Sequence, residues 1–370
     1  MHIRIPLAVL TLAVVAGGAS AQIKMAFQKK ISLAGVTGIG SNPSAVAWNG
    51  STAFVGGFNA SGATANTGVV RIDNVLTTPT TSSVFGALST NNNRGITQMA
   101  VRGGTLAVAW DNGAGSGDSI RTFNTSNNSL KWRVGTSASD SSRRGNAVAF
   151  DPGFNGADAT PDVSYLGIGS GRRHRLSDAA GTYTDGQNGG AIINFSPIST
   201  NWRGMAFDPT TGDLYTRESN RIGKAVRTAD NAFQGNASTT IGGLTSFNAV
   251  GQSISFVNST EFGKFLIVND RTSVGGGQAF TSVIKAFTTS GTQQTITFNG
   301  LTLPADGNGY YDFSFDAATQ SLAILDFNNR DLYVFNVTAT AAAPEPGSLA
   351  LMLLGGGAGV AALIRRRRAV

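Results

Sequence analysis

A short pattern that recurs six times along the chain constrains the fold more than any other feature. Each copy has a large apolar residue, a small residue and then an aromatic or apolar residue, and successive copies start 53, 49, 57, 49 and 59 residues apart. A near-constant period of this length is typical of repeated structural units. We call this pattern the signature. Its six copies are Val46-Ala47-Trp48, Met99-Ala100-Val101, Val148-Ala149-Phe150, Met205-Ala206-Phe207, Ile254-Ser255-Phe256 and Phe313-Ser314-Phe315.

Turn-forming residues and further strand-like runs follow the signature. The turns use Gly for positive φ, Pro for fixed φ and Asp for hydrogen bonds to nearby backbone, as in residues 208–213. The second apolar runs cover residues 53–55, 106–108, 165–166, 214–215, 265–268 and 322–325. The third runs cover residues 69–72, 120–123, 191–195, 222–226, 283–287 and 332–337. Fourth runs are recognisable at residues 83–85, 130–134, 239–241 and 295–298.

Units of four strands that repeat in this way predict an all-β, six-bladed β-propeller over residues 22–337. The last unit ends after its third strand, at Val337. The unassigned run Lys24 to Leu33 is therefore predicted to complete the sixth blade and close the ring, which removes an exposed sheet edge. A β-sandwich or a β-helix is the alternative for such a repeat.

One unit resembles a known family of propellers. The run from Met205 to Tyr215 is similar to the strand–turn–strand phrase of NHL-type and gluconolactonase-type propellers. The likeness is good in this one unit and weak in the others. It therefore implies the propeller fold and carries little information about chemistry.

The N-terminus has the order of segments found in secretory signal peptides. Arg4 precedes a short apolar core, and Ala19-Ser20-Ala21 supplies small residues for signal peptidase. We expect residues 1–21 to be a signal peptide that is cleaved before Gln22. The alternative is an uncleaved anchor, for which the apolar core is short.

The C-terminus combines a tripeptide, an apolar segment and a basic cluster. Pro344-Glu345-Pro346 precedes an uncharged segment of 17 residues, 348–364, and four arginines follow it directly. A segment of this length just spans a bilayer, and the arginines hold its end on the cytoplasmic side. The basic cluster is Arg365, Arg366, Arg367 and Arg368.

This ending resembles the PEP-CTERM family of sorting signals over residues 344–370, after a linker at 338–343. The resemblance implies recognition by an exosortase at the inner membrane, removal of the tail, and delivery to the cell surface or the extracellular matrix. It also implies a setting in which exopolysaccharide is produced. An ordinary C-terminal membrane anchor is the alternative.

Composition excludes several kinds of site. The chain has no cysteine, which rules out disulfides and thiol nucleophiles, and only two histidines, of which His2 lies in the predicted signal peptide. A catalytic triad would have to use His174. The net charge of +7 comes mostly from the two ends, and the body keeps 23 basic against 20 acidic residues. We therefore expect no nucleic-acid partner.

Candidate ligand-binding residues precede the signature, where the loops that lead into the first strands would converge at one mouth of a propeller channel. Arginines there can bind carboxylates or sulfates through their forked donors, and aromatic faces can stack on sugars. The structural alternative is that the arginines bind backbone carbonyls or stay solvated. The candidates are Arg94, Arg144, Trp202, Arg203, Tyr310 and Tyr311.

Two further segments carry polar clusters. The insertion at 169–190 contains a basic group that suits an anionic polymer, although a solvated loop is the alternative. The run from Asp111 to Asp118 has oxygen ligands and glycines but lacks the spacing of an EF-hand, so calcium stays a minor hypothesis and no cofactor is predicted. The basic group consists of Arg172, Arg173, His174 and Arg175.

These observations favour a non-catalytic, exported propeller that binds polysaccharide or protein. A metal-dependent lactonase or hydrolase is the first alternative, but the body has only Glu218 and Glu261 as glutamates, and neither lies where the gluconolactonase-type resemblance implies a metal ligand. A purely structural surface scaffold is the second alternative.

Overall fold

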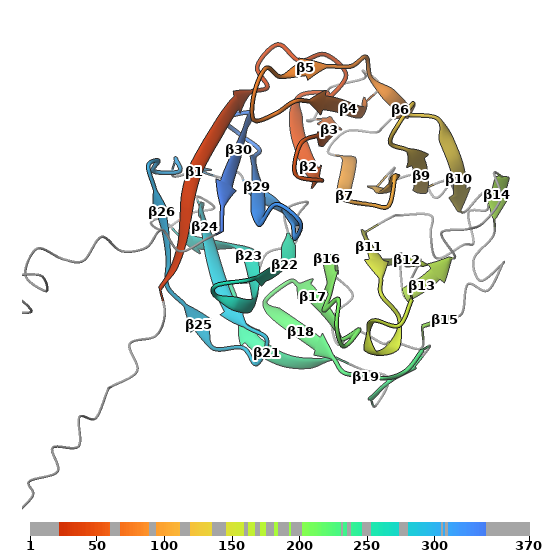
Figure 1. The fold of residues 1–370 in the computed structure, drawn as a ribbon, viewed down its shortest axis with the longest axis vertical. Coiled ribbons are helices and arrows are strands. Elements are labelled where there is room, and N and C mark those ends of the chain that lie inside the picture. Colours follow the sequence, from red (N-terminus) through yellow and green to blue (C-terminus); the bar gives the residue numbers. More distant parts are fainter. Residues whose placement is uncertain are drawn as a thin grey trace, which may run out of the picture.

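The computed structural model shows strands in several sheets that stand around a common axis, which is the arrangement of a β-propeller (Figure 1). A 3-10 turn lies at Phe154–Gly156. The structure describes residues 22–59, 67–88, 94–111, 119–134, 146–158, 162–166, 171–174, 181–183, 192–193, 202–230, 232–234, 238–245, 253–273, 280–304, 306–307 and 310–337.

Each signature forms part of a strand that pairs antiparallel with the next strand in sequence. The signature strands are β2 (Asn42–Trp48), β7 (Arg94–Arg102), β11 (Ala147–Asp151), β16 (Trp202–Phe207), β22 (Ile254–Ser259) and β28 (Tyr311–Asp316). Their partners are β3 (Ala53–Asn59), β8 (Thr105–Asp111), β12 (Asp162–Leu166), β17 (Leu214–Glu218), β23 (Gly263–Ser273) and β29 (Ser321–Asp326).

The sheets continue outward with third strands and shorter outer strands. A short pairing between β3 and β7 joins two of these groups into one ten-stranded sheet. The third strands are β4 (Thr67–Asp73), β9 (Ile120–Asn124), β13 (Gly171–His174), β18 (Arg221–Ala225), β24 (Phe280–Thr288) and β30 (Asp331–Asn336). The outer strands are β1 (Ile23–Ser32), β5 (Thr80–Thr81), β6 (Phe85–Leu88), β10 (Leu130–Val134), β14 (Gly181–Tyr183), β15 (Ile192–Ile193), β19 (Arg227–Ala229), β20 (Ala232–Phe233), β21 (Thr239–Gly243), β25 (Gln293–Gln294), β26 (Ile296–Asn299) and β27 (Asp306–Gly307).

The apolar core consists of clusters that lie between successive sheets. One cluster joins Val46 of β2 and Val55 of β3 to Leu325 and Leu332 of the last sheet, and another joins Phe54 to Leu106 and Trp110. All seven residues of β3 and of β8 are buried, so these strands present apolar surface on both faces. A sheet that is buried on both faces needs a neighbour on each side, which is why the repeated units stabilise one another.

The N-terminal strand lies beside the C-terminal one. β1 pairs antiparallel with β30, from Ala26 opposite Asn336 to Ser32 opposite Asp331, and the Met25 side chain is fully buried. The pairing expected for the run at 24–33 is therefore confirmed. It covers the edge of β30 with the first described strand of the chain.

Two predicted strand positions were wrong. The run at 295–298, expected as the fourth strand of the fifth unit, forms β26 and pairs parallel with β1 of the last sheet, while β25 takes the outer position on β24. The third strand of the third unit is β13, not the run at 191–195, whose residues 192–193 form the fourth strand β15. In both cases the strand pairs with a sheet edge whose backbone groups are still open, and the pattern of side chains in the sequence does not show which edge that is.

The placement of β13 also corrects the expected basic loop. Arg172, Arg173 and His174 lie in a strand, where they pair with Tyr165, Ser164 and Val163 of β12. Arg175 lies outside the described residues. The backbone groups along the edge of β12 need hydrogen-bond partners, and the polar segment Gly171–His174 supplies them as β13.

The predicted signal peptide 1–21, the linker 338–343 and the sorting segment 344–370, including the apolar stretch 348–364, all lie outside the described residues. In the part that is described, no helix has the length and apolar character that crossing a bilayer requires.

Candidate functional site at the axial channel

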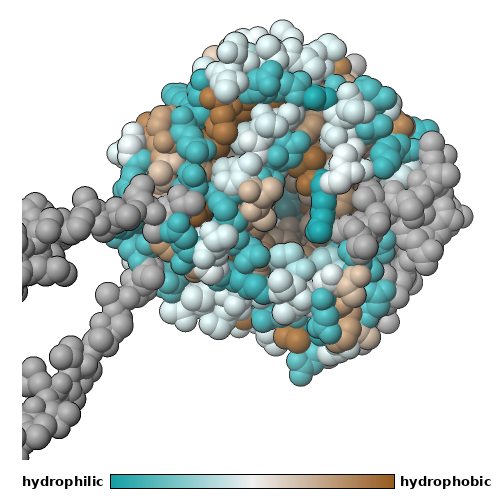
Figure 2. Space-filling view, in the orientation of Figure 1, coloured by the Kyte–Doolittle hydropathy of each residue, from teal (hydrophilic) through white to brown (hydrophobic). Residues whose placement is uncertain are grey.

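The signature strands enclose a cavity on the axis of the molecule. Its volume is about 180 Å³, and all six strands contribute to its lining, through Trp48, residues 98–102, 148–150, 205–207, 254–256 and 313–315. In the space-filling view the centre of the molecule is hollowed at the same place (Figure 2). The pattern that defines the repeat in the sequence therefore also forms the wall of the channel.

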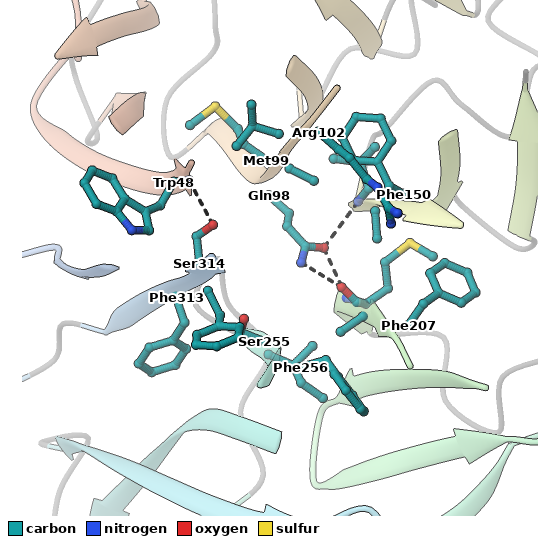
Figure 3. A pocket seen from close by; sticks show the side chains of 18 residues that line it. Trp48, Gln98, Met99, Arg102, Phe150, Phe207, Ser255, Phe256, Phe313 and Ser314 are labelled. Atoms are coloured by element: carbon teal, nitrogen blue, oxygen red, sulfur yellow. Dashed lines mark hydrogen bonds between the residues drawn. The ribbon is translucent and has the colours of Figure 1, made fainter. Parts of the chain in front are cut away.

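Gln98 crosses this channel and binds two other sheets. Its Oε1 accepts hydrogen bonds from the backbone N–H groups of Val148 at 3.2 Å and Met205 at 3.1 Å, and its Nε2 donates to the Met205 carbonyl at 2.9 Å (Figure 3). The inner edge of a signature strand has no neighbouring strand, so its backbone groups need such partners. The residues at the equivalent positions of those two units, Ala147 and Gly204, are small.

Replacing Gln98 with leucine is expected to destabilise the protein by about 1–3 kcal/mol, because three backbone groups on β11 and β16 lose their partner in a buried place. Urea unfolding of the full-length chain measures the difference. Gln28→Leu on the exposed face of β1 is the matched control and should stay within about 0.5 kcal/mol of the wild type. Equal stabilities for the two variants would contradict this role of Gln98.

Asp312 occupies the same repeat position as Gln98 and binds the neighbouring strand β2. Its Oδ2 accepts a hydrogen bond from the Val46 N–H at 2.7 Å, and two residues along, Ser314 Oγ accepts from the Trp48 N–H at 2.9 Å. Burial raises the pKa of the Asp312 carboxyl to about 7, and hydrogen bonds from Val46, Ser253 and Phe313 oppose that rise. The inner edge of β2 is thus closed by a carboxyl group that lies away from water.

The channel widens into a second cavity where the signature strands end. This channel mouth has a volume of about 390 Å³ and includes the third signature residue of five units together with the turns that follow. Phe150, Phe256 and Phe315 are half-buried there, whereas Phe207 is buried. The lining residues are Val101, Arg102, Phe150, Pro152, Phe207, Pro209, Phe256, Asn258, Phe315, Asp316, Ala317 and Ala318.

Arg102 and Asp316 are the charged residues of the channel mouth. Arg102 is exposed and makes no hydrogen bond or ion pair with any described residue. Asp316 uses Oδ2 to accept hydrogen bonds from the N–H of Thr319 at 2.8 Å and from its hydroxyl at 2.6 Å. A cavity lined by partly buried phenylalanines, one exposed guanidinium and one carboxylate suits a ligand with both apolar and ionic parts.

Ion pairs between sheets fix the turns beside the channel mouth. Asp151 and Asp208 directly follow the signatures of their units, and each binds a basic residue of the next sheet along. Asp151 pairs with Arg227 in full burial, while Lys264 binds both oxygens of Asp208 at 3.0 Å and is 31% exposed. Burial raises the pKa of Asp208, but the Thr210 N–H and Lys264 outweigh it and hold that pKa below its usual value.

The predicted ligand-binding residues lie toward the opposite end of the signature strands. Arg94, Trp202 and Arg203 are in β7 and β16 by backbone position, their side chains lie outside the described part, and Arg144 lies outside it altogether. Tyr310 is buried against the Phe327 ring, with centroids 4.5 Å apart, and Tyr311 is buried and donates its hydroxyl to the Pro304 carbonyl. Neither tyrosine presents a free face for stacking on a sugar.

Sequence reasoning missed the channel mouth as a binding surface. The signal was present in the third position of the signature, which is aromatic in five of six copies. A repeated aromatic residue suggests core packing, and Phe207 does pack in the core. Phe150, Phe256 and Phe315 also pack against core clusters, but they are only partly buried and line the channel mouth.

In the described part of the chain, no three His, Asp or Glu side chains lie close enough together to hold a metal ion. Asp111 is buried, and residues 112–118 of the calcium hypothesis lie outside the described part. Glu218 is buried and binds Arg221 at 2.7 Å, while its Oε1 accepts from Ser238 at 3.0 Å. These contacts give Glu218 a structural role within its sheet.

Comparisons with known proteins bear on the fold. No protein-family model matches the chain, and no curated protein matches its sequence. Among solved structures, an auxiliary nutrient binding protein from Bacteroides thetaiotaomicron superposes with a TM-score of 0.56 at 12% identity, covering 83% of this chain and 71% of that one. The β-propeller domain of Myceliophteria thermophila Cps50 (Swd1) gives 0.46 at 10% identity, covering 85% of this chain and all of that domain. The first likeness, at this identity, shows a shared fold and nothing more.

Proposed function

We propose that this protein is an exported, non-catalytic binding protein of the cell surface or extracellular matrix, and that it binds its ligand at the channel mouth. The observation that carries the proposal is a cavity of about 390 Å³ lined by phenylalanines and by Arg102, which is exposed and has no partner among the described residues. The shared fold with a nutrient binding protein is consistent with a binding role.

The proposal includes six blades, one for each signature, within a domain at 22–337. The six signature strands that line the axial cavity support this count, as does the pairing of β1 with β30. The opposite end of the signature strands, with Arg94 and Arg203 near the starts of β7 and β16 and with Arg144 before β11 in the sequence, is a second candidate face of the same domain.

Export and sorting rest on the two ends of the sequence. A signal peptide at 1–21 and a PEP-CTERM-like segment at 344–370 would carry the chain across the inner membrane, tether it in transit and hand it to an exosortase. The partners proposed outside the cell are polysaccharide or protein.

The proposal is tested in the organism that encodes the chain. Intact mass of the protein from the culture supernatant or the surface fraction should correspond to a chain that starts at Gln22 and lacks the basic tail. Recovery of the uncleaved chain from the cytosol would contradict export.

Blocking the channel mouth tests the binding role. Ala318 is exposed at the rim, so Ala318→Trp fills the opening without disturbing the core. Retention of the protein on the cell surface is expected to fall about tenfold, since a blocked pocket loses its buried contacts. Ala229→Trp adds the same ring at an exposed site on β19 and should leave retention unchanged. Equal retention of the two variants would refute binding at this mouth.

A further inference from the structure

We infer that the ligand of the channel mouth is the carboxyl terminus of a peptide whose last residue is apolar. The inference rests on the proposed function and names the chemistry of its ligand. Three features of the mouth carry it: partly buried phenylalanines in the lining, an exposed guanidinium without a partner among the described residues, and carboxylate and amide oxygens that can accept backbone N–H groups.

The channel mouth suits an apolar side chain better than a sugar. Phe150, Phe256 and Phe315 contribute rings that have no polar atom, and Val101 and the turn prolines add further apolar surface. A sugar ring carries several hydroxyl groups that need partners, and the only polar side chains in the lining are Arg102, Asn258 and Asp316. An aromatic or branched aliphatic side chain has no such need.

Arg102 supplies the charge that a chain end requires. It is the only basic residue in the lining of the channel mouth, and it has no partner among the described residues. A guanidinium presents two parallel N–H donors, which match the two oxygens of a carboxylate.

Asp316 and Asn258 suit the peptide groups that precede the chain end. Asp316 Oδ1 accepts no hydrogen bond from a described residue, since both bonds from Thr319 go to Oδ2. The Asn258 side chain also makes no hydrogen bond with a described residue and lines the same cavity. A ligand with backbone N–H donors beside its carboxylate complements these acceptors, whereas a simple anion has no donor for them.

The test uses the full-length chain and isothermal titration with an acetylated tripeptide that ends in phenylalanine. The free acid is expected to bind at least about tenfold more tightly than the same peptide with an amidated end, because only the acid forms a charge-assisted bond. Arg102→Gln should remove this difference. Lys24→Gln, the control, removes one positive charge from β1 at the rim of the molecule and should leave the difference in affinity between acid and amide unchanged.

Other arms separate the alternatives. Ala318→Trp should abolish binding of the free-acid peptide. Equal affinities of the wild type for the acid and the amide would overturn the inference. Equal affinities of the wild type and Arg102→Gln for the acid would overturn it as well. Free phenylalanine that binds as tightly as the peptide would identify an amino acid as ligand, and a trigalacturonate that binds more tightly would identify an acidic polysaccharide. If the peptide does not bind but Ala318→Trp still releases the protein from the cell surface, the peptide is not the ligand. The proposed function, binding at the channel mouth, then still holds.

Discussion

Replacing Arg227 with alanine should destabilise the protein by about 3–5 kcal/mol, because the variant leaves the Asp151 carboxylate buried without its counter-ion. Both side chains are fully buried, and the guanidinium binds both oxygens of the carboxylate, with Nη2 at 2.8 Å from Oδ2. Arg227 also lies between two rings, its Cζ at 5.7 Å from the centroid of Phe207 and 5.0 Å from that of Phe233. Its loss therefore removes an ion pair, two cation–π contacts and packing at the same time.

Urea unfolding at pH 7 measures this effect, and the next unit offers a matched control. Lys264 pairs with Asp208 at the equivalent repeat position but is 31% exposed, so Lys264→Ala should cost less than about 1 kcal/mol. The double variant Asp151→Leu with Arg227→Ala should regain part of the loss, since no lone buried charge remains. Similar losses for Arg227→Ala and Lys264→Ala would show that burial does not determine the strength of these pairs.

This ion pair also shows where prediction from the sequence ends. Asp151 and Asp208 follow their signatures and precede prolines, a pattern that predicts turns, and Asp208 does accept the Thr210 N–H at 2.8 Å. Their second role depends on the sheet that packs next to them. Arg227 is 76 residues from Asp151, and the local sequence around it has no feature that names this partner.

The strands themselves were predictable because their apolar runs repeat with a regular period. Every signature and every second run lies in a strand, since burial on both faces demands apolar residues along the whole run. The outer strands were harder, because their order depends on which backbone edge is open. β26 thus pairs with β1 of the last sheet, and β13 places arginines in a strand.

The candidate site was only partly predictable for the same reason. The axial position follows from the propeller architecture, and the residues of the wall follow from the repeat. The role of Arg102 at the channel mouth could not be predicted in this way, because in the sequence Arg102 looks like part of a turn with Gly103 and Gly104. Its significance comes from Phe150 and Phe315, which other sheets bring to the same cavity.

The wild type should lose stability as the pH rises, and replacing Asp312 with asparagine should abolish most of this pH dependence. Burial raises the pKa of this carboxyl from 3.8 to about 7, so between these values the folded chain keeps a proton that the unfolded chain has released. The stabilisation is full below about pH 4 and disappears as the pH rises through 7, at a cost on the order of 4 kcal/mol. Asparagine keeps an acceptor for the Val46 N–H and cannot ionise.

Urea unfolding of the full-length chain from pH 5 to pH 8 checks this expectation. The wild type should lose stability across this range, whereas Asp312→Asn should show a flatter profile and be the more stable of the two at pH 8, since it carries no buried charge there. Ser314→Ala is the matched control, because it removes the acceptor of the Trp48 N–H two residues away without removing a titratable group. It should lower stability equally at every pH. Parallel profiles for wild type and Asp312→Asn would mean that the carboxyl ionises in the folded protein without penalty, and that water reaches the inner edge of β2.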